Sequence, residues 1–270
     1  MSEWNRESVV WRQGHLLSQT DVQRLGLVLP EYSDSTLVLL VSHDCDIAND
    51  ATREPDVEVV LGYLVDESNP NYVFGKNPRL LELPFQNLVP LQAQFNIQSR
   101  QAISKDNLQH CTPNTAHLEQ RYVRVLQGWL ASRYDRPAFP DEFDSLIKDE
   151  RISTKLAKLG VKYGSLVSGL LFDLRESTDI YHLGILVLYV SNSEPIKAYE
   201  IAQTYSQEIT KAFEARFFDS KAETWKSIEL TYCRAISEDN LTFSQARDYQ
   251  RWNLDAVSYA ADPQQALPID

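Results

Sequence analysis

Cysteine is scarce in this 270-residue sequence, and the positions of the cysteines indicate neither a disulfide bond nor a zinc site. The three cysteines, Cys45, Cys111 and Cys233, lie far apart, and none belongs to a CxxC pair. An odd and scattered set argues against a disulfide framework and against a zinc finger. We therefore expect three reduced thiols and a reducing, cytoplasmic location.

Long apolar runs are also missing. The most apolar stretches, TLVLLV and LGILVLYV, have the length of β-strands and are too short for a membrane-crossing helix. The first residues, MSEWNRESVVWRQG, carry interspersed charges and no apolar core of signal-peptide length. The sequence therefore predicts no membrane partner.

Several common catalytic and cofactor motifs are absent as well. The sequence has no Gly-rich phosphate loop and no HExxH helix, and GSLVSG does not satisfy the GxSxG pattern. No cofactor is thus indicated by a motif, and Mg²⁺ or Mn²⁺ is expected only if the protein is a metal-dependent enzyme.

Positive charge is in deficit, because 26 Lys and Arg face 38 Asp and Glu, giving a net charge of −12 and a pI of about 4.9. Such a field repels polyanions, so nucleic acid is expected to bind only through a local basic patch. The more natural partner for this surface is another protein.

The apolar pattern predicts an α+β fold with two domains and a connection. Short strand-like runs separated by turn formers predict a strand-rich small barrel or bent sheet in residues 1–97. Helical spacing beginning at Thr112, and again in PDEFDSLIKDE and ISTKLAKLG, predicts a helical connection over residues 98–160, with Gly160 as its C-cap.

Residues 161–270 predict an antiparallel sheet with covering helices. A hairpin over 166–190 and a strand near 228–236 surround a helix over 195–218. A capping box, Thr242 with Gln245, predicts a last helix, TFSQARDYQRW. The apolar side of the long helix is expected to face the sheet, and it contains Ile196, Tyr199, Ala202, Tyr205, Ile209, Phe213 and Phe217.

The most unusual string is His43-Asp44-Cys45-Asp46, which follows the TLVLLV strand and opens a polar loop. If the next strand pairs antiparallel, Asp56 and Glu58 come near this string. A cluster of Asp44, Asp46, Asp56 and Glu58 would suit a divalent cation, with His43 as a general base.

Two alternatives compete with a metal site at this loop. Cys45 could act as a nucleophile assisted by His43, His110 or His117. The simpler alternative is a turn, in which the aspartates cap backbone amides, Cys45 is a small buried hydrophobe and His43 is a satisfied polar group.

A second group of candidates is basic. Lys76 and Arg79 lie in the GKNPR loop, and Arg121 and Arg124 lie beside the apolar stripe of the expected helix. These four cations could bind an anionic ligand such as a phosphate. The alternative is salt bridging to the many acidic residues of the surface.

Three segments, VSHDCDIAN, EPDVEVV and RYDRPAFPDEFD, together resemble bacterial proteins often found in mobile or phage-defence gene neighbourhoods, over about half of the chain. The segments WRQGHLL and LVLLVSHD are loosely similar to the small barrel of MazF-type toxins, whose catalytic residues have no match here. The resemblance implies a cytoplasmic bacterial defence or mobile-element component that binds another macromolecule. The alternative is a divalent-metal-dependent nuclease or phosphodiesterase with Arg79 as its phosphate anchor.

Overall fold

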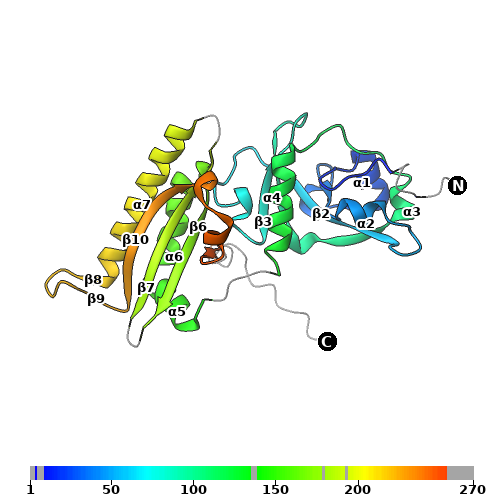
Figure 1. Cartoon of the computed structure of the whole chain (residues 1–270). Coiled ribbons are helices and arrows are strands. Elements are labelled where there is room, and N and C mark those ends of the chain that lie inside the picture. The colour runs from blue at the N-terminus through cyan, green and yellow to red at the C-terminus, as the bar shows by residue number, and fades with distance from the viewer. Residues whose placement is uncertain (1–3, 5–8, 135–138, 178–179, 192–193, 254–270) are drawn as a thin grey trace. The chain divides into compact units, whose positions relative to one another are not determined.

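The chain divides into two compact units (Figure 1). The computed structural model describes residues 4, 9–134, 139–177, 180–191 and 194–253. The first unit consists of Met1–Ser68 and Pro78–Arg133, and the second consists of Asn69–Asn77 and Tyr134–Asp270. The expected helical connection over 98–160 is thus shared between the two units.

The first unit is built on an antiparallel sheet. Its strands are β1 (Leu37–Leu40), β2 (Asp56–Leu64), β3 (Leu80–Pro84), β4 (Gln92–Asn96) and β5 (Gln101–Ser104). They follow the order β1-β2-β4-β3, and β5 also pairs with β2. Since the described strands β1 and β3 remain at opposite edges, the sheet is open: of the two forms predicted for this unit, a small barrel or a bent sheet, the barrel does not form.

Both faces of this sheet are buried, which explains why β1 is apolar at every position. Val38 and Leu40 belong to one apolar cluster, and Leu37 and Leu39 belong to another on the opposite face. The helices of the unit are α1 (Gln19–Leu25), α2 (Asp44–Ala48), α3 (Lys105–Leu108) and α4 (Gln120–Ala131). Helices α1 and α3 contribute to the first cluster, and α4 contributes to the second.

Helix α4 begins seven residues later than the sequence predicts. Thr112 and Pro113 were expected to open it, but Pro113 forms a β-bridge with Leu17 and His117 forms one with Gln86. These bridges hold the chain extended until Gln120. Contacts between residues far apart in the sequence therefore override the local helix-start pattern.

The second unit contains a four-stranded sheet, order β10-β7-β6-β11, with helices on one face (Figure 1). Its main elements are α5 (Asp141–Asp149), α6 (Ile152–Tyr163), β6 (Val167–Glu176), β7 (Tyr181–Tyr189), α7 (Pro195–Phe217), β10 (Ile228–Ser237) and β11 (Gln250–Trp252). The predicted sharing of one sheet by the hairpin and the 228–236 strand is confirmed. Strands β8 (Phe218–Asp219) and β9 (Thr224–Trp225) form a small separate hairpin, and α8 (Phe243–Ala246) precedes β11.

One pairing in this sheet is parallel, although only antiparallel pairs were expected. Strands β6 and β7 are antiparallel, as are β6 and β11, but β10 runs parallel to β7. Helix α7 makes this possible because it returns the chain to the starting end of β7 before β10 begins.

Helix α7 buries most, but not all, of its predicted apolar side. Ala202, Tyr205, Ile209, Phe213 and Phe217 pack in the core beneath the sheet. The side chains of the first turn do not, since Ile196 is 74% exposed and Tyr199 is 43% exposed. The core therefore covers a shorter part of the helix than the sequence pattern suggests.

The prediction of a last helix over TFSQARDYQRW is mostly wrong. The capping box of Thr242 and Gln245 is present, but α8 has only one turn and the chain then forms β11. Trp252 stacks on Phe172 of β6 with ring centroids 4.9 Å apart, which favours the strand. The expected loose tail after residue 253 lies outside the described residues. No helix among the described ranges is long and apolar enough to span a membrane.

Candidate functional site

The string His43-Asp44-Cys45-Asp46 forms the start of helix α2. The His43 imidazole accepts a hydrogen bond from the Cys45 backbone N–H (3.3 Å), so His43 is the N-cap. The Asp44 carboxylate accepts from the backbone N–H of Gln13 at 2.8 Å. These bonds are those of a capped turn, although Cys45 is exposed and not buried as that alternative supposed.

The other two carboxylates of the expected metal site, Asp56 and Glu58, are exposed on β2. Glu58 lies 3.6 Å from the Arg100 guanidinium. Among the described residues, no three His, Cys, Asp or Glu side chains gather in a way that could hold a metal ion. Asp44, Asp46, Asp56 and Glu58 therefore do not form the expected metal site. Asp44 accepts a hydrogen bond from Gln13 instead, and Glu58 forms an ion pair with Arg100.

The four expected anion-binding cations are divided between the two units. Lys76 belongs to the second unit and is buried, whereas Arg79, Arg121 and Arg124 belong to the first. Arg121 forms a 3.0 Å ion pair with Glu119, as the salt-bridge alternative proposed, and Arg124 is exposed. Of these four cations, only Lys76 is therefore buried within its own unit.

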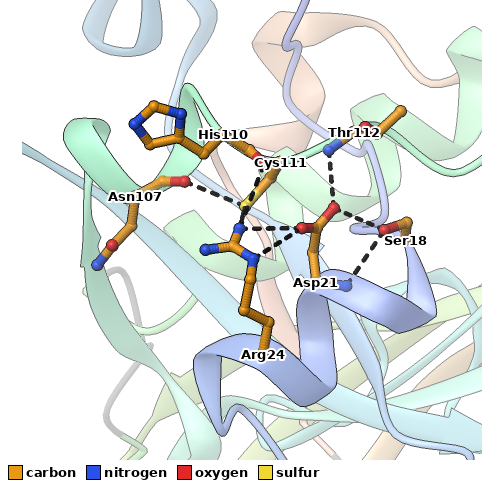
Figure 2. Close-up of polar contacts among 7 residues, drawn as sticks. All are labelled: Ser18, Asp21, Arg24, Asn107, His110, Cys111 and Thr112. Carbon is orange, nitrogen blue, oxygen red and sulfur yellow. Dashed lines mark hydrogen bonds and ion pairs between the residues drawn. The ribbon is translucent and has the colours of Figure 1, made fainter.

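A polar cluster that the sequence analysis did not single out connects α1 to the chain that follows α3 (Figure 2). Asp21, only 7% exposed, accepts hydrogen bonds from the Ser18 hydroxyl (2.6 Å) and the Thr112 backbone N–H (2.8 Å). The Arg24 guanidinium donates to Asp21 at 2.9 Å and approaches the Cys111 sulfur at 3.1 Å. Ser18 is also the N-cap of α1, so the cluster fixes the start of that helix.

The electrostatics of this cluster favour a charged carboxylate and a neutral thiol. Burial acts to raise the pKa of Asp21, but hydrogen bonds from Ser18, Thr112 and Arg24 outweigh burial and hold that pKa below its ordinary value. Burial raises the pKa of the Cys111 thiol despite the nearby Arg24. The imidazole of His110 points away from the sulfur (Figure 2). The arrangement therefore supports packing and helix capping, not nucleophilic catalysis by Cys111.

All three cysteines are free thiols, as the sequence predicts, but their reactivities should differ. Cys45 is exposed, whereas burial raises the pKa of Cys111 and raises that of Cys233 to about 12. We expect iodoacetamide at pH 8 to modify Cys45 at least about tenfold faster than the other two in the folded protein, because the reactive form is the thiolate. Peptide mass spectrometry over time measures the three rates, and all three should react in denaturant. Equal rates in the folded protein would contradict the burial of Cys111 and Cys233.

An apolar tip lies on the first unit between β3 and β4. It consists of Leu88, Val89, Pro90 and Leu91, and a hydrogen bond from Phe85 N–H to the Leu91 carbonyl (2.7 Å) closes the loop. Val89 is 89% exposed and Leu91 is 54% exposed, while Leu88 packs partly against the core. Consecutive exposed apolar residues are unfavourable in water, so a run of this kind indicates a contact surface.

Two local signals could have identified these features from the sequence. The spacing of Ser18 and Asp21 fits the [ST]-x-x-[DE] pattern of a helix start, which is where the buried cluster forms. The run LVPL stands outside any alternating strand pattern, as expected for an exposed apolar loop. The proximity of Arg24 to Cys111 has no such signal, because 87 residues separate them in the chain.

Fold and surface together define an α+β protein of two units with a capped polar loop and an exposed apolar tip. No family model, curated protein or solved structure matches the chain. The function is therefore argued from the residues of the chain themselves.

Proposed function

We propose that this protein acts by binding another protein through the apolar tip, Leu88 to Leu91. The observation that carries the proposal is the exposure of Val89 and Leu91, at 89% and 54%, within four consecutive apolar residues. Covering such a surface with an apolar groove removes it from water and stabilises a complex, by roughly 25 cal/mol per Å² of apolar area. The net charge of −12 supports a protein partner over a nucleic acid.

The cellular setting belongs to the same proposal. Three free cysteines support a reducing, cytoplasmic location. The resemblance carried by VSHDCDIAN, EPDVEVV and RYDRPAFPDEFD supports a bacterial defence or mobile-element system. A metal-dependent nuclease or phosphodiesterase has no such support, because its expected ligands do not converge among the described residues.

A pair of matched variants tests the proposal. Val89→Asp and Val10→Asp each place a carboxylate on an exposed valine of the first unit, 89% and 64% exposed, but only Val89 belongs to the tip. We expect both variants to melt within a few degrees of the wild type, since surface changes usually alter stability by less than about 0.5 kcal/mol. Only Val89→Asp should lose the biological effect of the protein.

Photo-cross-linking identifies the contact directly. A photoreactive phenylalanine at position 89, expressed in the source cells, should give a discrete heavier adduct that the same residue at position 10 does not. The partner, identified by mass spectrometry and purified, should bind the wild type and Val10→Asp at least about tenfold more tightly than Val89→Asp. Equal binding by Val89→Asp and the wild type would exclude the apolar tip as the contact surface.

A further inference from the structure

The second unit contains a small, partly open cavity between the Asn69–Asn77 segment and the sheet-and-helix core. Its free space is about 10 Å³, which is room for about one water-sized particle. The residues around it that matter most are Asn71, Lys76, Gly160, Gly164, Tyr205 and Trp252. They come from four separate stretches of the chain, so the cavity exists only in the folded unit.

Lys76 brings a charge into this cavity. Its side chain is 5% exposed, and its ammonium donates to the backbone carbonyls of Gly164 (2.7 Å) and Val167 (2.8 Å). Two of its three protons are thereby used. Within the part of the chain that the structure describes, Lys76 forms no ion pair with a carboxylate, and the charge that acts on it most is a second cation, Arg251.

Arg251 is also poorly compensated. One of its terminal nitrogens donates to the carbonyls of Phe74 (3.0 Å) and Ser168 (2.7 Å), while its buried Nε has no partner. Glu238 exerts a weaker opposing influence than burial, which lowers the pKa of Arg251. Removing a cation from water without a counter-charge costs several kcal/mol, so two such cations that act on each other electrostatically call for a negative charge.

Glycines keep the space around these cations free. A methyl group added at Gly164 would lie 3.1 Å from the Lys76 nitrogen, and one at Gly169 would lie 3.3 Å from the Arg251 guanidinium. A methyl group at Gly160 would collide with the side chain of Asn71. The Asn71 side chain is fully buried, and its Oδ1 has no hydrogen-bond partner. At least one buried hydrogen-bond acceptor, the Asn71 Oδ1, is therefore unsatisfied in the cavity.

We propose that this cavity is a binding site for a halide-sized monoanion, held by the remaining ammonium proton of Lys76 and by the positive field of Arg251. The size of the cavity excludes sulfate and phosphate. The unpartnered Asn71 oxygen repels an anion, but its partial charge is small beside the full charges of protonated Lys76 and Arg251. A water molecule would satisfy Asn71 and leave both cations uncompensated.

Halide exchange tests this site. Thermal unfolding is followed at about pH 6, where Lys76 is protonated, at constant ionic strength while sodium sulfate is replaced by sodium chloride or bromide. The midpoint of the wild type should rise by several degrees, and above the dissociation constant it should keep rising with the logarithm of the halide concentration L, because a ligand that binds only the folded state stabilises it by RT ln(1 + L/Kd). Lys76→Met should weaken the apparent halide affinity at least about tenfold.

The matched control is Lys221→Met, which makes the same exchange at an exposed position of the same unit. It should keep the halide response of the wild type. If Lys76→Met and the wild type respond alike, the stabilisation is a general salt effect and the proposal is wrong.

Anomalous X-ray diffraction from bound bromide tests the proposed site even if Lys76→Met fails to fold. Crystals of the wild-type protein soaked in bromide should show an anomalous peak within contact distance of the Lys76 nitrogen. Gly164→Ala, which keeps Lys76 but narrows the cavity, should lower the occupancy of that peak. A wild-type crystal with no peak in the cavity at saturating bromide would overturn the proposal.

Discussion

Raising the pH from about 7 to about 9 is expected to increase the free energy of unfolding by about 2–3 kcal/mol. The cause is Lys76, whose burial, with Arg251 nearby, lowers its pKa from the ordinary 10.5 to about 7. Between these values the unfolded chain carries a proton that the folded chain lacks. Each pH unit of this interval therefore adds about 1.4 kcal/mol of stability, and below about pH 7 the full cost of the buried charge remains.

The window ends near pH 9 because other groups then act in the opposite direction. Burial raises the pKa of the Cys233 thiol from 9.0 to about 12, and it also raises the pKa of Tyr205. Each of these acids stays protonated in the folded protein while it ionises in the unfolded chain, so each lowers stability as the pH rises further. Stability should thus pass through a maximum.

Urea denaturation in sulfate buffers, followed by circular dichroism, measures this effect. Lys76→Met should flatten the slope between pH 7 and 9, whereas the exposed Lys221→Met should leave it unchanged. The groups near the Lys76 nitrogen are Arg251 and Tyr205, and neither titrates in this window in the unfolded chain. An identical slope in Lys76→Met would show that another group is responsible.

Replacing Asp21 by alanine should lower the free energy of unfolding by about 3 kcal/mol. The buried carboxylate accepts from the Thr112 backbone N–H and from Arg24, and its loss leaves both donors without this acceptor (Figure 2). The Ser18 hydroxyl also loses the acceptor on which its capping orientation depends. Asp21→Asn retains one oxygen acceptor and should cost about half as much.

Asp34→Ala is the matched control, since Asp34 is exposed on the same unit and should change stability by less than about 0.5 kcal/mol. The pH dependence gives a second measurement. Because the pKa of Asp21 in the folded protein lies below its ordinary 3.8, its contribution is complete above that value and is lost as the pH falls through the lowered pKa. The gap between wild type and Asp21→Ala should therefore close in acid, and a gap that persists there would assign the loss to packing.

The sequence pattern predicts those elements whose residues satisfy their needs locally. The run TLVLLV contains β1, and the spacing from Ala202 to Phe217 gives the buried side of α7. The capping box at Thr242 also forms where it is expected. In each case the signal and the structure lie within a few residues of one another, so local chemistry is sufficient.

Features that depend on distant partners could not be predicted in this way. Strand β11 forms because Trp252 packs on Phe172, some 80 residues earlier. This distant contact outweighs the local helical pattern of TFSQARDYQRW. From the sequence, Lys76 resembles an exposed loop residue. In the fold its ammonium donates to the backbone carbonyls of Gly164 and Val167, which are distant in the chain. The exposed start of α7 at Ile196 likewise reflects how far the core extends, which no local pattern contains.

The Asn69–Asn77 segment has a consequence for how the protein is made. The ribosome delivers it more than fifty residues before Tyr134, where the rest of the second unit begins. Domains tend to fold in the order of their synthesis, so the first unit can form around β2 and β3 while the segment between them still has nothing to pack against. A chain cut or stalled before Ala157 would lack the carbonyls of Ala157, Gly164 and Val167 to which Asn71 and Lys76 donate, and would offer cellular proteases an unpaired loop. Completion of the second unit is therefore also the step that protects the first from cleavage.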